Sequence, residues 1–430
     1  MGNDTGARRV FLFLQGPHGP FFSRLAHMLR RTGAEVWRAG FNAGDSAFWP
    51  DRASYLPYRG TPEDWPPALA KILAGKGVTD IVLYGDTRPI HAEAISLARA
   101  RGLRIHVFEE GYMRPYWVTY ERGGTNGNSR LMELSVAQMR ADLERSDMDS
   151  ALPPASWGDM RQHIFYGTLY HFCVLALNWR YRNFRPHRAI TVHKEFGLHL
   201  KRLVLMPVQA INRRIATWRI RHGGFPYHLA LLQLEHDSSF QMHSPFGTMA
   251  DFLETVIVGF ARGAPGHHHL VVKAHPLEDG RVPIRRDLRR LAGAHGVTLR
   301  VHFVRGGKLA RLLDEARSAV TINSTAAQQV LWRGIPLRTF GAAVYAKPEF
   351  VSTKPLAEFF AGAERPDRKA YTDYRRYLLE TSQIAGGFYS SRGRRQLLRQ
   401  AVDMMLSADD PYDALRSGTA APRQQLRVVT

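Results

Sequence analysis

The feature that most constrains the fold is a repeated alternation of short apolar, β-prone runs with helical stretches. The run Arg9–Leu14 is followed by a glycine- and proline-containing turn, a helical stretch over 21–32 and a second β-prone run over 35–41. The same order recurs over 79–108. Strands that alternate with helices in this way predict a parallel sheet with helices on both faces.

The alternation resumes near residue 229 and predicts a second sheet. Between the two halves, residues 161–222 carry ten Arg and two Lys against a single acid, Glu195, with aromatic residues interleaved and a helical periodicity. We therefore expect two α/β halves joined by a basic helical segment. The strands expected in the second half are 229–235, 269–274, 298–303, 319–323 and 337–340.

These patterns predict a chain of several parts, as its 430 residues also suggest. The expected parts are an N-terminal Rossmann-like domain (1–150), a basic helical segment (151–225), a C-terminal Rossmann-like domain (226–365), C-terminal helices that pack back across the domains (366–410) and a disordered tail (411–430).

The charge balance restricts the partners. With 59 Lys and Arg against 38 Asp and Glu, the formal net charge is +21. Such a surface attracts nucleic acid, anionic lipid, sugar phosphates or acidic sugars. Nucleic acid is disfavoured because the chain has no recognisable nucleic-acid-binding module. Cys173 is the single cysteine, so no disulfide forms within the chain. Without a signal peptide or an apolar run of about 20 residues, we expect a cytoplasmic protein that meets a membrane only from its surface.

Ligands of such sheets bind beyond the carboxyl ends of the strands, so we expect functional residues at or just after the end of each strand. The run 103–108 ends in Glu109-Glu110-Gly111. Because successive strand side chains point to opposite faces, only one of the two carboxylates needs to face a cleft. The alternative is that both are loop acids paired with neighbouring arginines.

A second strand end carries cationic side chains. The run 269–274 contains Lys273 and is followed by His275-Pro276, a combination suited to binding an anion. His267-His268-His269 lies just upstream, but consecutive strand residues do not all face one ion and no Cys or acid stands at ligand spacing. We therefore expect no metal, and a purely structural histidine remains the alternative.

A third strand end carries hydroxyl groups. Asn323-Ser324-Thr325 follows the run 319–322 and precedes a helical stretch. Ser or Thr at this place can cap the helix, or the start of the helix can bind a phosphate. The Gly16–Pro20 loop lacks the spacing of a dinucleotide-binding or P-loop motif, and no Gly-x-Ser-x-Gly elbow is present. A dinucleotide dehydrogenase, a P-loop ATPase and an α/β-hydrolase are therefore excluded.

Taken in order, these three strand ends resemble the motifs of bacterial sialyltransferases and Kdo transferases, which use CMP-sugar donors. Longer strings resemble the KpsS/LipB family of capsule polysaccharide biosynthesis proteins over about residues 10–350. They are Phe13–Phe22, Phe41–Asp45, Gly85–Ile90, Phe108–Pro115, Glu121–Ser129, His243–Phe246 and Thr321–Thr325.

The resemblance implies a GT-B glycosyltransferase, with two Rossmann-like domains facing a cleft. It implies transfer of 3-deoxy-D-manno-oct-2-ulosonic acid (Kdo) from CMP-β-Kdo to a lysophospholipid, with retention of configuration, to start the poly-Kdo linker of a capsular polysaccharide. The expected partners are CMP-Kdo, the lysophospholipid, an anionic membrane surface at the inner face of the cytoplasmic membrane and other capsule proteins, with no cofactor, metal or nucleic acid. The alternative is a non-catalytic capsule assembly or export protein.

The resemblance also assigns roles to residues. Glu110 matches the catalytic carboxylate, although related chain-extending enzymes carry Glu-Asp-Gly where this chain carries Glu-Glu-Gly. The single phosphate of CMP is expected at Lys273, His275, Pro276, Asn323, Ser324 and Thr325. The donor sugar is expected at Arg88, Arg114 and His243, and the candidates for the acceptor side or the base are His18, Asp45 and Asp86.

Overall fold

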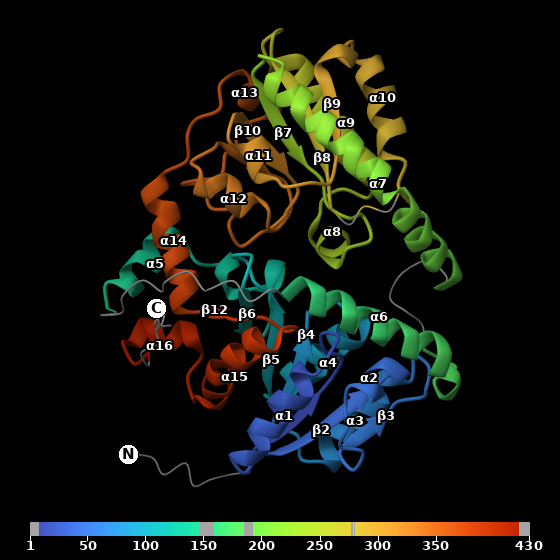
Figure 1. Ribbon diagram of the computed structural model, residues 1–430. Helices are drawn as coiled ribbons and strands as arrows, with labels where there is room; N and C mark the ends of the chain where they lie inside the picture. Colours follow the sequence, from blue (N-terminus) through green and yellow to red (C-terminus); the bar gives the residue numbers. More distant parts are fainter. Residues whose placement is uncertain (1–7, 146–158, 185–191, 277, 279, 421–430) are drawn as a thin grey trace. The chain divides into compact units, whose positions relative to one another are not determined.

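A computed structural model describes residues 8–145, 159–184, 192–276, 278 and 280–420. The chain divides into two compact units. Unit 1 contains residues 1–130, 137–187 and 376–430, and unit 2 contains residues 131–136 and 188–375. Each unit is built on its own β-sheet with helices on both faces (Figure 1). The expectation of two Rossmann-like α/β halves is therefore confirmed.

The sheet of unit 1 has seven strands in the order β12-β6-β5-β4-β1-β2-β3. Strands β1 to β5 run parallel, whereas β6 and β12 are antiparallel additions at one edge that the alternation did not predict. The strands are β1 (Val10–Phe13), β2 (Glu35–Gly40), β3 (Tyr55–Pro57), β4 (Asp80–Tyr84), β5 (Arg104–Glu110), β6 (Trp117–Arg122) and β12 (Gln383–Ala385).

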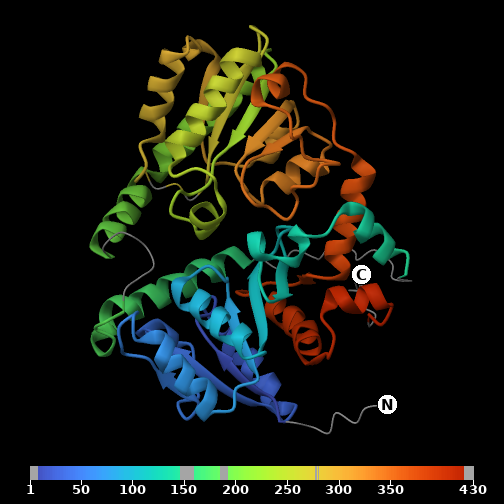
Figure 2. The same ribbon diagram turned by 180° about the vertical axis from the view of Figure 1, so that it is seen from behind.

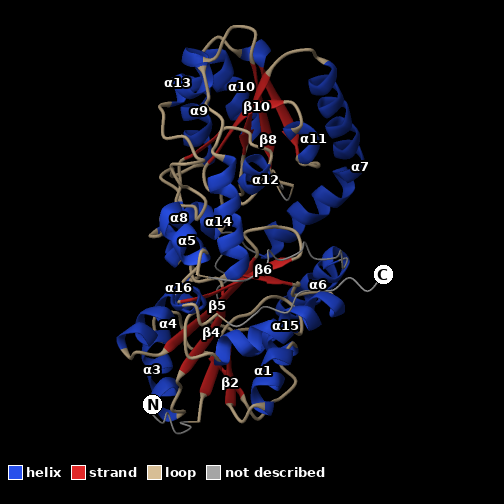
Figure 3. Ribbon diagram, turned by 90° about the vertical axis from the view of Figure 1, so that its left-hand side faces the viewer, coloured by secondary structure: helices blue, strands red, loops and turns tan. Residues whose placement is uncertain are grey.

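The helices of unit 1 cover both faces of this sheet. In Figure 3, α1 and α15 lie on one side of the strands and α3 and α4 on the other. The helices are α1 (Phe21–Arg31), α2 (Ala43–Ala47), α3 (Trp65–Gly75), α4 (Pro89–Ala100), α5 (Val136–Leu143), α6 (Asp159–Leu177), α15 (Ser391–Leu406) and α16 (Pro411–Ser417).

Strand β1 shows why the two faces form. Phe11 and Phe13 point into a core with α1 and α15. Val10 and Leu12 point into the opposite core with α3 and α4. All four side chains are buried, which is why a strand inside a parallel sheet reads as a continuous apolar run.

The C-terminal residues complete unit 1 rather than extend the chain outward. The two views of Figures 1 and 2 place α15 and α16 beside the first sheet. Arg122 of β6 donates hydrogen bonds to the carbonyl groups of Met404, in the last turn of α15, and of Ser407 and Ala408, which follow it. The expectation of a disordered tail from 411 is wrong for 411–417, which form α16, because Tyr412 and Leu415 are buried in unit 1, and Arg130 also pairs with Asp413.

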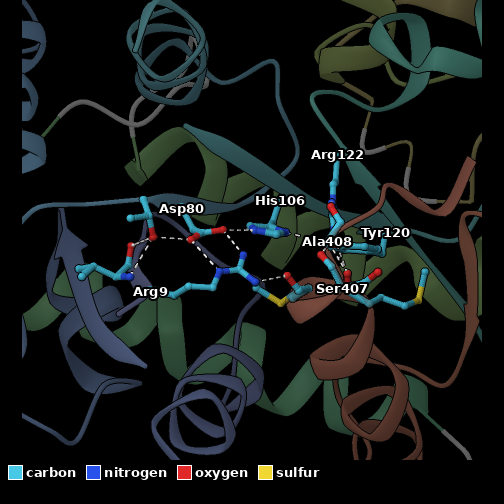
Figure 4. A network of polar contacts seen from close by, with 11 residues as sticks. Arg9, Asp80, His106, Tyr120, Arg122, Ser407 and Ala408 are labelled. Carbon is cyan, nitrogen blue, oxygen red and sulfur yellow. Dashed lines mark hydrogen bonds and ion pairs between the residues drawn. The ribbon is translucent and has the colours of Figure 1, made fainter. Parts of the chain in front are cut away.

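A buried polar network lies at the amino ends of β1, β4 and β5, beside the carboxyl end of the antiparallel β6 (Figure 4). Asp80 pairs with Arg9 and accepts from His106 Nε2 at 2.8 Å, and His106 Nδ1 lies 2.7 Å from the Tyr120 hydroxyl. Arg9 also donates to the carbonyl oxygen of Met405 at 2.8 Å. The network therefore fastens the end of α15 to strands β4, β5 and β6.

The sheet of unit 2 has five parallel strands in the order β11-β10-β7-β8-β9. They are β7 (Tyr227–Leu231), β8 (His269–Ala274), β9 (Val301–Arg305), β10 (Ala316–Thr321) and β11 (Leu337–Thr339). The helices are α7 (Val192–His222), α8 (Ser238–His243), α9 (Met249–Gly263), α10 (Ile284–Ala294), α11 (Ala310–Leu313), α12 (Ala327–Trp332) and α13 (Leu356–Ala361). Helix α14 (Arg368–Glu380) contains the boundary between the units.

Within the basic segment, residues 161–177 and 192–222 are α-helical, as predicted, but the segment is not one separate body. Helix α6 belongs to unit 1 and helix α7 to unit 2. Among the described residues, no helix is long and apolar enough to span a bilayer.

Candidate functional site

The carboxyl end of β5 carries the two glutamates. Glu109 pairs with Thr119 of β6 and Glu110 with Val118, so the two side chains leave the sheet on opposite faces. Glu109 lies over Gly85, because a Cβ atom built at Gly85 would be 3.0 Å from Glu109 Oε2. Glu110 is the half-buried carboxylate of the other face.

Two tyrosine hydroxyl groups approach the carboxylate of Glu110. Its Oε1 atom lies 3.4 Å from the hydroxyl of Tyr84, at the end of β4, and 3.5 Å from that of Tyr389, which precedes α15. Burial raises the pKa of Tyr84 well above its ordinary value, and the charge of Glu110 adds to this effect. Tyr84 is therefore a neutral donor aimed at the carboxylate. The ring of Tyr389 stacks on His163 of α6, with 4.2 Å between the ring centroids.

The two arginines expected at the donor sugar gather around the same tyrosine. The Arg88 guanidinium lies 5.8 Å from the centroid of the Tyr84 ring, and the charge of Arg114 lowers the pKa of the Tyr84 hydroxyl against the larger effect of burial. Arg88 also donates to Gln15 Oε1 at 3.3 Å, and Arg114 is exposed. The structure therefore places Arg88 beside Tyr84 and Glu110 within unit 1, with Arg114 within electrostatic range of Tyr84.

Asp45 lies in α2, the short helix that follows β2. It is 2% exposed and pairs with Arg38 at 3.1 Å, and its Oδ2 atom accepts from the backbone N–H of Phe41 and from Gln15 Nε2. With these partners Asp45 positions Gln15, which in turn holds Arg88. A role as base stays a prediction.

Asp86 is also buried, at 3% exposed, directly after β4. Its Oδ2 atom accepts from the backbone N–H of Thr125 at 2.8 Å and from Asn128 Nδ2 at 3.1 Å, so it anchors the loop after β6. Its Oδ1 atom has no hydrogen-bond partner in the part of the chain that the structure describes.

His18 lies under helix α6. Its ring stacks on Tyr170, with 4.4 Å between centroids, and the Tyr170 hydroxyl accepts from Asn42 Nδ2. The neighbouring Gly19 has a φ of 109°, and a Cβ atom there would be 3.0 Å from the Tyr166 ring. Glycine at 19 therefore allows α6 to approach the carboxyl ends of β1 and β2 closely.

In unit 2 the cationic group is Lys273, the fifth residue of β8. It is 6% exposed, and burial, reinforced by the charge of Arg213, lowers its pKa to about 8. No hydrogen bond or ion pair of its ammonium group occurs among the described residues, so this charge is available to a ligand. His275, half-buried, and Pro276, exposed, follow directly.

The loop after β10 is fixed by Asn323. Its Oδ1 atom accepts from Gln233 Nε2 at 2.6 Å and its Nδ2 group donates to the carbonyl of Ser239, while its backbone N–H donates to Gln233 Oε1. Asn323 is therefore occupied within the loop. It also donates to the carbonyl of His243 at 3.3 Å, which brings the end of α8 to this loop.

Ser324 and Thr325 follow and are half-buried. The N-cap position of α12 is Ala326, so neither hydroxyl caps the helix. Ser324 Oγ accepts from the backbone N–H of Ala326 at 3.3 Å.

The strand register places the loops after β8 and β10 at the same position along the strands. Lys273 and Thr321 both pair with Leu231, one on each side of β7. Neighbouring strands are about 4.8 Å apart, so the loops after β8 and β10 are roughly 10 Å apart across β7. A lysine, a histidine and two hydroxyl groups at this edge are donors suited to one phosphate group.

Four side chains at these edges were not predicted from the sequence. Tyr84, Tyr389 and His163 come from three separate segments, and Arg213 comes from the basic helix. Tyr84 is the last residue of β4, as Glu110 is of β5, so its position at a strand end was visible in the sequence. The other three depend on tertiary packing. In the described residues no group of three or more His, Cys, Asp or Glu is arranged to hold a metal ion, and the expectation of metal independence stays a prediction.

Comparison with known proteins identifies the family. Residues 79–389 match the family described as "Capsule polysaccharide biosynthesis protein". The chain belongs to this capsule family. The "Capsule polysaccharide export protein KpsS" of Escherichia coli is 30% identical over 387 residues, which cover 89% of this chain and 97% of the relative. The "Capsule polysaccharide modification protein LipB" of Neisseria meningitidis serogroup B is 30% identical over 386 residues, or 88% of this chain and 91% of the relative.

Solved structures give weaker likenesses. The β-Kdo 2,7 transferase KpsC of Thermosulfurimonas dismutans aligns with a TM-score of 0.44 at 12% identity, over 92% of this chain and 100% of that one. Its β-Kdo 2,4 transferase aligns with a TM-score of 0.40 at 11% identity, over 92% of this chain and 98% of that one. The fold of this capsule-family chain is accordingly argued from its own strand topology.

Proposed function

We propose that this protein is a retaining GT-B glycosyltransferase that moves Kdo from CMP-β-Kdo to a lysophospholipid, lysophosphatidylglycerol, and so starts the poly-Kdo linker of a capsular polysaccharide. The observation that carries the proposal is the carboxylate of Glu110 at a strand end, approached by two tyrosine hydroxyl groups and accompanied by Arg88 and Arg114. Membership of the capsule family supports the pathway, and Kdo transfer follows from the resemblance in sequence.

In the proposed reaction Glu110 is the nucleophile. Its carboxylate attacks the anomeric carbon of Kdo, the bond to the CMP phosphate oxygen breaks, and CMP leaves with the bonding electrons. A hydroxyl group of the acceptor then displaces Glu110 and loses its proton to a base, and two inversions give net retention. The hydroxyl groups of Tyr84 and Tyr389 would hold the carboxylate in position.

Unit 2 would supply the groups that stabilise the departing phosphate. Lys273, His275, Ser324 and Thr325 are a lysine, a histidine and two hydroxyl groups at one sheet edge, and their charge and hydrogen bonds favour a developing anion. The guanidinium groups of Arg88 and Arg114 would pair with the carboxylate of Kdo, because arginine binds carboxylates in a bidentate manner. The base is a proposal among His18, Asp45 and Asp86.

The acceptor is a membrane lipid, so we place the enzyme at the inner face of the cytoplasmic membrane. Helix α6 supports this location. The side of α6 that packs on unit 1 carries His163, Tyr166 and Tyr170, whereas the other side exposes large apolar residues. These are Ile164, Phe165, Leu169, Phe172 and Leu175, and Leu177 and Trp179 continue the exposed patch at the end of the helix.

The test is an assay in which CMP-Kdo is generated in situ, lysophosphatidylglycerol is the acceptor, and mass spectrometry detects a lipid heavier by one Kdo residue. Glu110→Gln should lower turnover by at least about 10³-fold. It should leave CMP affinity unchanged, because the residues proposed to bind the CMP phosphate belong to unit 2. Glu109→Gln is the matched control and should retain more activity, because Glu109 points to the opposite face.

Two results would contradict the proposal. Turnover by Glu110→Gln within tenfold of wild type would remove the nucleophile. Absence of any Kdo-containing lipid with wild-type protein would favour the non-catalytic assembly alternative. CMP binding is measured separately by calorimetry, where His275→Ala should weaken it by about 10- to 100-fold, since a hydrogen bond to a charged group is lost.

A further inference from the structure

Unit 2 contains a large basic cavity beside the groups proposed for the CMP phosphate, with which it shares Pro276. Its volume is about 1040 Å³, and it lies where the C-terminal part of α7 meets the loop after β9. Its lining includes no acidic residue. The lining residues are Arg213, Arg214, Ile215, Thr217, Trp218, Arg219, Arg221, His222, Pro276, Gly307, Lys308 and Arg311.

The wall of this cavity is built by close packing of Arg213 on a glycine turn. Gly306 and Gly307 both have a positive φ, at 69° and 85°. A Cβ atom at Gly307 would lie 2.6 Å from the Cδ atom of Arg213, so the arginine packs directly on this turn, where the positive φ favours glycine. Ile220 of α7 is buried, which holds this end of the helix on the unit. Arg213 and Ile220 therefore join this end of α7 to the rest of unit 2.

An exposed apolar stripe leads along α7 to the cavity. It consists of Leu205, Val208, Ile211, Ile215 and Trp218, which are 37 to 61% exposed. Their spacing of three or four residues places them on one side of the helix, over a length of about 20 Å. Ile215 and Trp218 belong both to the stripe and to the lining of the cavity. Binding of a soluble anion would require only the basic side chains. This surface, however, combines basic side chains with a continuous exposed apolar stripe.

We propose that this cavity binds the headgroup of an anionic glycerophospholipid at the membrane surface. The phosphate lies among the arginines of α7 and α11, and Ile215 and Trp218 enter the interfacial region of the bilayer. A helix with basic residues beside an apolar face that contains tryptophan has the composition of an interfacial helix. The choice of a lipid rests on the proposed function, in which the acceptor is a membrane lipid.

The test measures binding of the full chain to sedimented vesicles of phosphatidylglycerol and phosphatidylcholine mixed 30:70, and to pure phosphatidylcholine, with no sugar donor present. Each basic residue near an anionic surface contributes roughly fivefold in affinity. Arg214→Glu/Arg311→Glu should therefore reduce binding to the mixed vesicles by at least about tenfold. The matched control is Arg289→Glu/Arg290→Glu, an exposed pair on α10 that changes the charge equally and should change binding less than about twofold.

A second pair of variants tests the apolar part. Trp218 is 61% exposed and Trp332, on α12, is 57% exposed, so Trp332→Ala is a matched control for Trp218→Ala. We expect Trp218→Ala to weaken binding to the mixed vesicles by at least threefold and Trp332→Ala to leave it within twofold. Because all these positions are exposed, folding is checked by circular dichroism and should be unchanged.

Three outcomes would overturn the proposal: equal binding of wild type to pure phosphatidylcholine, binding by Arg214→Glu/Arg311→Glu within twofold of wild type, or complete displacement of the vesicles by millimolar CMP, which would assign the cavity to a soluble nucleotide. Because the assay contains no donor, its result is independent of whether Kdo transfer occurs.

Discussion

Replacement of Lys273 by methionine should stabilise the protein while it removes nucleotide binding. Lys273 is 6% exposed, and burial and the charge of Arg213 lower its pKa from 10.5 to about 8. At pH 7 the lysine is charged in both the folded and the unfolded states. The folded state therefore carries a cost of about 3 kcal/mol, since each factor of ten in proton affinity is about 1.4 kcal/mol.

Methionine has a similar length and no charge, so Lys273→Met should recover part of this cost, about 2 kcal/mol. For a unit of this size that corresponds to a rise of roughly 4 to 8 °C in the melting temperature of unit 2. CMP, which should raise the melting temperature of wild type, should no longer do so in the variant. Lys369→Met is the control, because Lys369 is exposed on α14.

The pH dependence gives the decisive check. A lysine whose pKa is lowered by folding destabilises the folded state below pH 8, and this cost disappears as the pH rises from 8 to 10.5. The gain from Lys273→Met should therefore fall by about 2 kcal/mol between pH 7 and pH 9.5, to near zero. A variant that melts at or below the wild-type temperature at pH 7, or that binds CMP as wild type does, would refute the reasoning.

Three further predictions follow from buried or paired groups. Burial raises the pKa of Glu121 to about 7, so stability is lost as the pH rises from 4.5 through 7, and Glu121→Gln should raise the melting temperature more at pH 8 than at pH 5. Tyr389→Phe removes a hydroxyl group near Glu110 and should slow Kdo transfer about tenfold in the coupled assay with little effect on calorimetric CMP affinity. Asp80→Asn should cost about 3 to 5 kcal/mol in urea unfolding, because it leaves Arg9 buried without its partner, and full stability would contradict that view of the network.

The sequence predicted the two α/β halves because a strand buried on both faces reads as an apolar run. Strand β1 was expected at Arg9–Leu14 and lies at Val10–Phe13. The expected run 319–323 is shifted, since β10 is Ala316–Thr321. Arg317 and Ser318, near the start of β10, are polar, and the register with β7 is irregular there. The beginning of this strand therefore does not read as an apolar run in the sequence. Strand β6 was missed because it returns antiparallel beside β5 without a connecting helix, and β12 because its pairing with β6 joins residues far apart in the chain.

The candidate site also contains some residues that the sequence could identify and others that only the tertiary structure reveals. Glu110, Lys273 and His275 could be chosen from the sequence because each follows or ends an apolar run. The contact of Tyr389 with Glu110 joins residues that are 279 positions apart, and no local pattern records such a contact. The stacking of His163 on Tyr389 depends on how α6 lies over unit 1, which the helical periodicity alone does not determine.

The return of the C-terminal segment to unit 1 has a consequence for synthesis on the ribosome. Strand β12 is an edge strand of the first sheet, and α15 covers one of its faces. Unit 1 therefore lacks part of its core until residue 406 has left the exit tunnel. All residues of unit 2, in contrast, have been synthesised once the ribosome reaches residue 375. At roughly 5 to 20 residues per second the incomplete sheet waits many seconds with apolar surface exposed. The half of the protein that is translated first thus finishes folding last, and a nascent chain stalled before β12 would be a substrate for chaperones.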